Sequence, residues 1–123
     1  GVSVAGFPNL FCMMGPGTGL GHGGSAMFQA EVQARYVTEC VTDMLNRGDR
    51  SMEVKREAQQ DFVDRLDAEH AQMIWMHPGL RTYYRNAKGR VFSLLPWRVV
   101  DYWHMARHVT RDDYRYKQSS SEP

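Results

Sequence analysis

A run of glycines near the start of the chain has the composition of a loop that closely approaches a ligand. Six of the ten residues from 15 to 24 are glycine, and a helical pattern follows at once from residue 25. Glycine lets a backbone come close to a ligand and adopts φ > 0 without steric cost. The N-terminus of a helix adds unpaired N–H groups and the positive end of its dipole. We expect this loop to face a phosphate or the electron-rich edge of a cofactor.

The same loop matches the dinucleotide fingerprint G-x-G-x-x-G at Gly19, Gly21 and Gly24. A complete Rossmann site also needs a second parallel strand that ends in an acidic residue, about 20 residues beyond the glycines. Here the helical pattern itself lasts about that long, and the extended segment 52–55 is short and polar. A complete site is therefore not expected. Two interpretations stay open: the loop forms a secondary wall of a cofactor site, or it only packs a helix against a strand.

The other side chains that could do chemistry lack partners at useful spacing. His104 and His108 stand four residues apart, but no third metal ligand accompanies them, so we expect no metal site. His22 lies inside the glycine loop without a visible acid or base partner, and a structural role is the simpler interpretation. Cys12 and Cys40 have neither metal nor redox spacing and are expected to be reduced. We assign no catalytic residue from the sequence.

Basic and aromatic residues interleave between residues 97 and 116, a pattern that can bind single-stranded nucleic acid. Asp101, Asp112 and Asp113 dilute the positive charge there, and the chain has 15 basic and 14 acidic residues, a formal net charge of +1. We therefore expect no nucleic-acid partner and a solvated helix face. A small non-enzymatic module that binds a partner through this Trp/Tyr/Arg-rich end remains an alternative.

Two elements must position the loop. Residues 9–14 are apolar and end at Gly15-Pro16, which predicts a buried strand. Residues 25–47 predict a long helix, with Ser25 as N-cap and Gly48 at the C-terminal glycine position. Its expected buried stripe consists of Met27, Ala30, Ala34, Val37, Val41 and Met44.

The remainder predicts further helices and a hairpin. After the extended segment 52–55, a second helix is expected from residue 56 to about 76, where His77-Pro78-Gly79 ends it. Its stripe consists of Phe62, Val63, Leu66, His70, Met73 and Ile74. Residues 82–85 and 91–94 flank a glycine-containing loop and predict a β-hairpin. Pro96 is expected to begin a third helix running to about residue 108, and residues 117–123 to form a frayed tail.

The length of 123 residues suits a single domain, and the apolar runs are too short to span a bilayer. No charged n-region and apolar h-region open the chain, so we expect no signal peptide. We expect a cytoplasmic protein with no membrane partner. The fold class is α/β, but one buried strand, two long helices and a hairpin make an incomplete set of layers. The chain begins with Gly rather than Met. We therefore expect these elements to belong to a larger α/β body that continues upstream in the same polypeptide.

Several blocks together resemble the C-terminal region of Baeyer–Villiger monooxygenases, members of the flavin-containing monooxygenase superfamily. The first two blocks are Gly-Phe-Pro-Asn-Leu-Phe at 6–11 and Gly-Pro-Gly-Thr-Gly-Leu-Gly-His-Gly at 15–23. The resemblance continues through the helix with Glu31, through Trp75, and through the segments 83–90, 96–98 and 101–103. It reaches to about residue 116 and is strongest for the branch that includes 4-hydroxyacetophenone monooxygenase.

The resemblance implies an oxidoreductase that binds FAD and NADPH. In the family, NADPH reduces FAD and O2 then oxygenates a small-molecule ketone to an ester or lactone, while some relatives oxygenate nitrogen or sulfur instead. The strand, loop and helix close the FAD domain with the helix N-terminus directed at the isoalloxazine ring. Carried onto this chain, the flavin neighbours are Gly15, Pro16, Gly17, Thr18, Gly19, Leu20, Gly21 and His22.

The resemblance also implies a division of the chain. Residues 1–50 would end the FAD-binding domain, residues 51–116 would wrap that body, and residues 117–123 would form the tail. The family's N-terminal FAD-binding motif, NADP-binding domain and F-x-G-x-x-x-H-x-x-x-W-P fingerprint do not occur in these residues, and its catalytic arginine comes from a segment upstream of them. A fragment of such an enzyme is therefore expected to be inactive alone.

Overall fold

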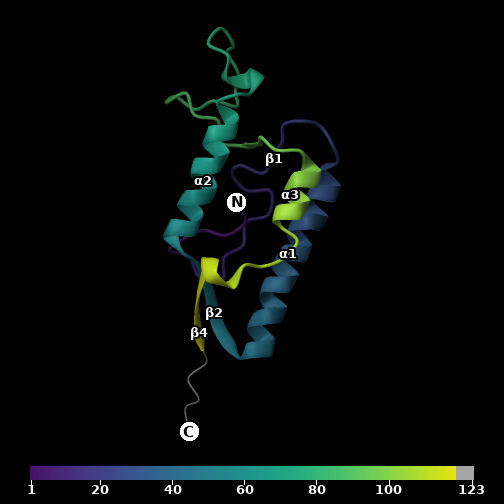
Figure 1. The fold of residues 1–123 in the computed structure, drawn as a ribbon, viewed down its shortest axis with the longest axis vertical. Helices are drawn as coiled ribbons and strands as arrows, with labels where there is room; N and C mark the ends of the chain where they lie inside the picture. Colours follow the sequence, from purple (N-terminus) through teal and green to yellow (C-terminus); the bar gives the residue numbers. More distant parts are fainter. Residues whose placement is uncertain (119–123) are drawn as a thin grey trace.

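The computed structural model describes residues 1–118 and contains helices and short strands, which confirms the α/β class. In Figure 1 the two long helices run along opposite sides of the molecule, and the N-terminal segment passes between them. The elements are β1 (Gly19–Leu20), α1 (Ala26–Arg47), β2 (Asp49–Val54), α2 (Arg56–His70), the 3-10 turn η1 (Ile74–Met76), β3 (Leu94–Leu95), α3 (Val99–Met105), η2 (Arg111–Asp113) and β4 (Tyr114–Gln118).

Helix α1 begins and ends where its capping residues predict. The Ser25 hydroxyl accepts a hydrogen bond from the Phe28 N–H, and Gly48 ends the helix in the left-handed conformation with φ 71°. The Gly48 N–H bonds back to the carbonyl groups of Met44 and Leu45. Both caps satisfy backbone groups that a helix end leaves free, so the local sequence alone defines this element.

The predicted buried stripe of α1 is wrong for half of its residues. Met27, Ala34 and Val41 are exposed, whereas Ala30, Val37 and Met44 are half-buried. The buried face instead carries Gln29, Val32, Gln33 and Cys40. Residues three and four apart share a helix face, so both stripes have helical spacing, and the less apolar of the two faces the rest of this chain.

Strand β2 includes the predicted extended segment and pairs antiparallel with β4 at one end of the molecule (Figure 1). Beneath the pair lies a core of Cys40, Met52, Val54 and Tyr114, with Tyr36 and Phe11 packed against it. Strand β4 was not predicted, and the predicted tail begins too early, because Lys117 and Gln118 lie in this strand. Residues 119–123 of that tail lie outside the described residues. The predicted boundary between residues 50 and 51 falls inside β2.

The predicted strand at residues 9–14 is wrong. The segment folds as successive turns with a single antiparallel bridge from Phe11 to Ser3, and Asn9 and Met14 have φ values of 59° and 53°. The physical reason is the side chain of Asn9, which accepts the Met52 N–H at 3.0 Å while the Asn9 N–H donates to the Met52 carbonyl at 2.9 Å. Asn is among the few residues that tolerate this left-handed conformation.

The later elements are shorter than predicted. Helix α2 ends at His70 rather than at about residue 76, and its stripe is buried or half-buried except Ile74, which is 76% exposed. The predicted hairpin reduces to one bridge between Arg85 and Val91, because the following strand β3 pairs in parallel with β1 instead. Helix α3 spans Val99–Met105, so Pro96 precedes it by three residues rather than starting it.

Candidate functional site

The glycine-rich loop at residues 15–24 lies against the segment that leads into β3. The Gly17 N–H donates to the Phe92 carbonyl at 2.9 Å, and the Gly19 N–H donates to the Ser93 carbonyl at 2.8 Å. The Thr18 N–H bonds back to the Gly15 carbonyl at 3.2 Å. These three donors are therefore occupied within the protein. A ligand could not bond to them, whereas the start of α1 leaves N–H groups free as a helix N-terminus does.

Close packing explains three of the glycines. A Cβ atom at Gly17 would lie 2.6 Å from Leu66 Cδ1, and Gly17 has φ +74°. A Cβ atom at Gly21 would lie 2.8 Å from the Leu95 carbonyl oxygen and 2.9 Å from the Trp75 ring. A Cβ atom at Gly19 would lie 2.8 Å from the Ser93 carbonyl oxygen. The loop therefore has glycines where it touches α2 and β3, as the packing interpretation requires.

The outer rim of the loop is open. Pro16, His22, Gly23 and Gly24 are exposed, and Gly23 has φ +79° with nothing within 4 Å of its Cβ position. The His22 ring lies 5.5 Å from the Trp75 ring, and its Nε2 is hydrogen-bonded to the Pro96 carbonyl. The rim leads directly into the first turn of α1, where the helix dipole is positive. This rim and helix start form the surface that could hold an electron-rich group.

The predicted site residues divide accordingly. The structure buries Gly17 and Thr18, half-buries Gly15, Gly19, Leu20 and Gly21, and exposes Pro16 and His22. Sequence reasoning missed the two side chains that hold the loop from α1, Gln29 and Gln33, although their spacing of four residues placed them on one helix face.

A buried histidine joins α2 to β3 behind the loop. The Trp75 Nε1–H donates to His70 Nδ1 at 2.9 Å, so His70 Nε2 carries the proton and donates to the Leu94 carbonyl at 3.0 Å. Burial lowers the pKa of His70 below its ordinary value. The imidazole is therefore neutral and links η1, α2 and the strand that pairs with the loop.

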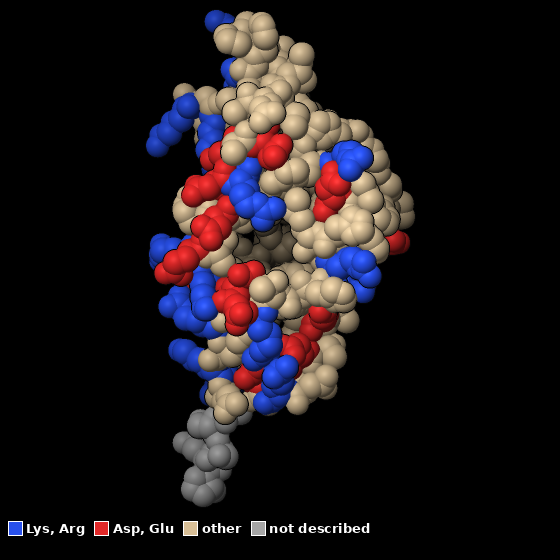
Figure 2. Space-filling model, in the orientation of Figure 1, with Lys and Arg blue, Asp and Glu red and all other residues tan. Residues whose placement is uncertain are grey.

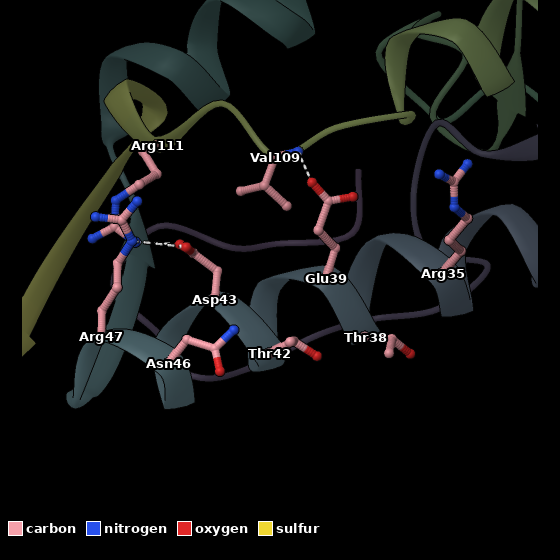
Figure 3. A pocket seen from close by; sticks show the side chains of 9 residues that line it. All are labelled: Arg35, Thr38, Glu39, Thr42, Asp43, Asn46, Arg47, Val109 and Arg111. Atoms are coloured by element: carbon pink, nitrogen blue, oxygen red, sulfur yellow. Dashed lines mark hydrogen bonds and ion pairs between the residues drawn. The ribbon is translucent and has the colours of Figure 1, made fainter.

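A polar groove of about 610 Å³ runs along α1 opposite the segment 109–111 (Figure 3). Glu39 accepts the Val109 N–H at 3.1 Å, and Asp43 pairs with Arg47 at 2.8 Å and with Arg111. The Arg47 and Arg111 guanidinium groups hold the pKa of Asp43 below its usual range. These contacts hold the segment before β4 against α1. The polar side chains of the groove are therefore paired with one another within the chain.

The remaining candidates do not gather into a site. His104 stacks edge-on with Trp103, and His108 lies 3.7 Å from Glu39. Between residues 1 and 118, no group of three or more His, Cys, Asp or Glu side chains is placed to hold a metal ion. Within the same residues, no helix combines the length and apolarity that crossing a membrane requires. Charged side chains of both signs alternate along α2 and toward the β2–β4 end in Figure 2.

Known proteins align with nearly the whole chain. An uncharacterized monooxygenase of Sinorhizobium fredii is 41% identical over 115 residues, which cover 94% of this chain. A Baeyer–Villiger monooxygenase of Pseudomonas aeruginosa is 37% identical over 102 residues, or 80% of this chain. An FAD-binding monooxygenase of Aspergillus niger is 25% identical across 98% of the chain. No family profile matches. The chain is therefore similar to a segment of several monooxygenases, among them a Baeyer–Villiger monooxygenase.

A solved structure has the same fold over nearly the whole chain. A steroid monooxygenase solved with NADP superposes on 97% of this chain with a TM-score of 0.80 at 20% sequence identity. The chain covers 17%, 19% and 20% of the three monooxygenases named above, and 22% of the steroid monooxygenase. It therefore spans about a fifth of the length of the monooxygenases that it matches, in agreement with the predicted fragment of a flavin monooxygenase.

Proposed function

We propose that this chain forms the part of an FAD- and NADPH-dependent Baeyer–Villiger monooxygenase that borders the flavin. The observation that carries the proposal is the joined surface of the glycine loop rim and the α1 N-terminus, in a chain whose relatives include FAD-binding and Baeyer–Villiger monooxygenases. The flavin neighbours proposed are Gly15, Pro16, Gly17, Thr18, Gly19, Leu20, Gly21 and His22.

The loop and helix fit a flavin edge physically. The rim at His22, Gly23 and Gly24 has no bulky side chain except the imidazole, which is bonded to Pro96, so a flat ring can approach the backbone. The α1 dipole then stabilises negative charge on that ring. A bound flavin, with NADPH as the reductant, would supply the chemistry for inserting one oxygen atom of O2 into a small-molecule ketone, while the other oxygen atom leaves as water. The residues of this chain orient the ring, stabilise its charge and exclude water beneath the loop.

We propose further that the upstream part of the same polypeptide covers the outer face of α1. Met27, Val41 and Leu45 are exposed there, although a helix face with large apolar side chains is typically buried. In this arrangement residues 1–50 complete the FAD-binding body, and residues 51–116 brace and wrap it. The chain alone would lack the rest of both cofactor sites and would be inactive.

The alternative of a partner-binding Trp/Tyr/Arg-rich end has less support. The Arg111 guanidinium lies 3.7 Å from the centre of the Tyr116 ring, and the Arg107 guanidinium lies 4.9 Å from the centre of the Trp103 ring. Arg111 also pairs with Asp43 and Asp49. These side chains are thus occupied within the chain.

Oxygenation of an amine or sulfide uses the same cofactors and remains the alternative reaction of the proposed enzyme.

Expression of the chain with and without the codons that precede Gly1 in its gene tests the proposal. The longer product should purify with bound FAD and consume NADPH when a ketone is supplied, whereas residues 1–123 alone should bind no flavin. An in-frame stop codon directly before Gly1, or a longer product without flavin, would refute it. Panels of ketones, amines and sulfides then separate the two reactions.

A charge at the helix start provides a sharper version of the same test. Ala26 is exposed in the first turn of α1, where an acidic side chain favours the helix but repels a reduced, anionic flavin. In the longer product, Ala26→Asp should weaken binding of reduced FAD about fivefold relative to the isosteric, uncharged Ala26→Asn, an energy of about 1 kcal/mol. Equal affinities for the two variants would place the flavin away from α1.

A further inference from the structure

Two buried glutamines on α1 contact the backbone at the glycine loop through their side chains. Gln29 and Gln33 are both 0% exposed, and their separation of four residues puts them on one face, about 6 Å apart along the helix axis. They lie among Val32 and Cys40, the other buried residues of this face.

Each glutamine is bonded to the backbone of the loop at a different point. The Gln33 Oε1 accepts the Met14 N–H at 2.6 Å, and the Gln29 Nε2 donates to the Thr18 carbonyl. These two backbone groups lie on either side of residues 15–17, so the glutamines hold both ends of the tight turn. The Gln33 Nε2 also donates to the Tyr102 hydroxyl at 3.1 Å, which connects the same brace to α3.

The opposite side of the turn is held as well. Gly17 packs against Leu66 of α2, and its N–H donates to the Phe92 carbonyl. A loop with this many glycines loses much conformational entropy when it is ordered, so contacts on both sides are needed to keep one conformation.

The hydrogen bonding of Gln29 indicates that its role is to hold the Thr18 carbonyl of the loop. Its Oε1 is buried without a hydrogen-bond partner among the described residues. Burying an unpaired polar atom is costly, and an apolar side chain of similar size would avoid that cost. The bond to the Thr18 carbonyl is the favourable contact that offsets it.

We propose that Gln29 and Gln33 are positioning residues that fix the loop relative to the α1 axis, so that the loop rim and the helix N-terminus present one continuous surface to the flavin. This inference rests on the proposed function in its reference to flavin. The bracing itself concerns only residues of this chain. Neither side chain contacts the cofactor, because both are fully buried under the loop.

Hydrogen–deuterium exchange of the full-length holoprotein tests the bracing, together with titration of FAD into the apoprotein. Gln29→Met and Gln33→Met each remove the loop bonds at nearly constant volume. Amides in peptides spanning residues 15–21 should exchange about threefold to tenfold faster in each variant, and FAD affinity should fall by a similar factor.

Tyr36→Phe is the matched control. It removes a half-buried hydrogen bond of the same helix, the contact of 2.6 Å between the hydroxyls of Tyr36 and Tyr114, at the core beneath β2 and β4. This variant should lose stability but keep loop exchange and FAD affinity at the wild-type values. Tyr102→Phe removes only the partner of the Gln33 Nε2 and serves as a milder variant if the Met variants fail to fold.

The outcomes separate the two proposals. Loop exchange in both Met variants that equals that of wild type or of Tyr36→Phe overturns the positioning role, and so does unchanged exchange in Tyr102→Phe if only that variant folds. Faster loop exchange with unchanged FAD affinity also overturns the positioning role toward flavin. A wild-type holoprotein that contains no FAD overturns the proposed function, and loop exchange then still decides whether the glutamines brace the loop.

Discussion

Substitution of Gly17 by alanine tests whether the loop is held against α2 as closely as the structure indicates. The φ of +74° at this position costs a non-glycine residue about 1–2 kcal/mol. The new Cβ would also lie 2.6 Å from Leu66 Cδ1, and Leu66 is only 3% exposed, so it has little room to move. Overpacking of this kind costs about 1–3 kcal/mol. The free energy of unfolding should therefore fall by about 2–5 kcal/mol.

Gly48→Ala isolates the backbone term of this estimate. Gly48 has nearly the same φ, +71°, but nothing lies within 4 Å of its Cβ position. Gly48→Ala should lower the free energy of unfolding by only about 1–2 kcal/mol. Urea-induced unfolding followed by tryptophan fluorescence measures both values. In the background of Leu66→Ala, the cost of Gly17→Ala should fall to that of Gly48→Ala, because the contact is gone. Equal losses for the two glycine variants in the wild-type background would refute the close contact.

Three further predictions concern the contacts around the loop. Because burial lowers the pKa of His70 in the folded state, the free energy of unfolding should be highest above pH 6.5 and decline below it. His70→Gln should reduce this pH dependence in urea unfolding between pH 7.5 and about pH 5, and an unchanged pH dependence would exclude His70 as its source. Asn9→Gly permits the left-handed backbone but removes the side-chain hydrogen bonds to Arg50 and Met52 of β2, and should lower the unfolding free energy by about 1–2 kcal/mol. A melting temperature equal to that of wild type would contradict the stabilising role of these bonds. Arg111→Lys loses the fork to Asp43 and Asp49 and the stacking on Tyr116, and should lower the unfolding free energy, by less at high salt; a loss independent of salt would argue against the ion pairs.

Elements with local signals were predictable from the sequence. Helix α1 is bounded by Ser25 and Gly48, whose capping geometry depends only on neighbouring backbone groups. The extended segment before α2 and most of the α2 stripe were also predicted, because their periodicity is local. The glycine loop was located for the same reason, since its composition permits little else.

Elements that depend on distant partners were not predictable. Asn9 turns the chain by bonding to Met52, 43 residues away, so an apolar run that suits a strand becomes a series of turns. Strand β3 pairs with β1 rather than with a hairpin partner, across more than seventy residues of sequence. The wrong face was chosen for α1 because its more apolar stripe lies outside this chain's own core. The glutamine brace likewise exists only once the loop lies over α1.

Hydrogen–deuterium exchange of the longer gene product with and without FAD tests whether the flavin lies at the loop rim and the start of α1. FAD should slow exchange in peptides that contain residues 20–27, the loop rim and the first turn of α1, where the N–H groups are not already held by β3. Protection elsewhere in the protein, with exchange at residues 20–27 unchanged by FAD, would contradict it.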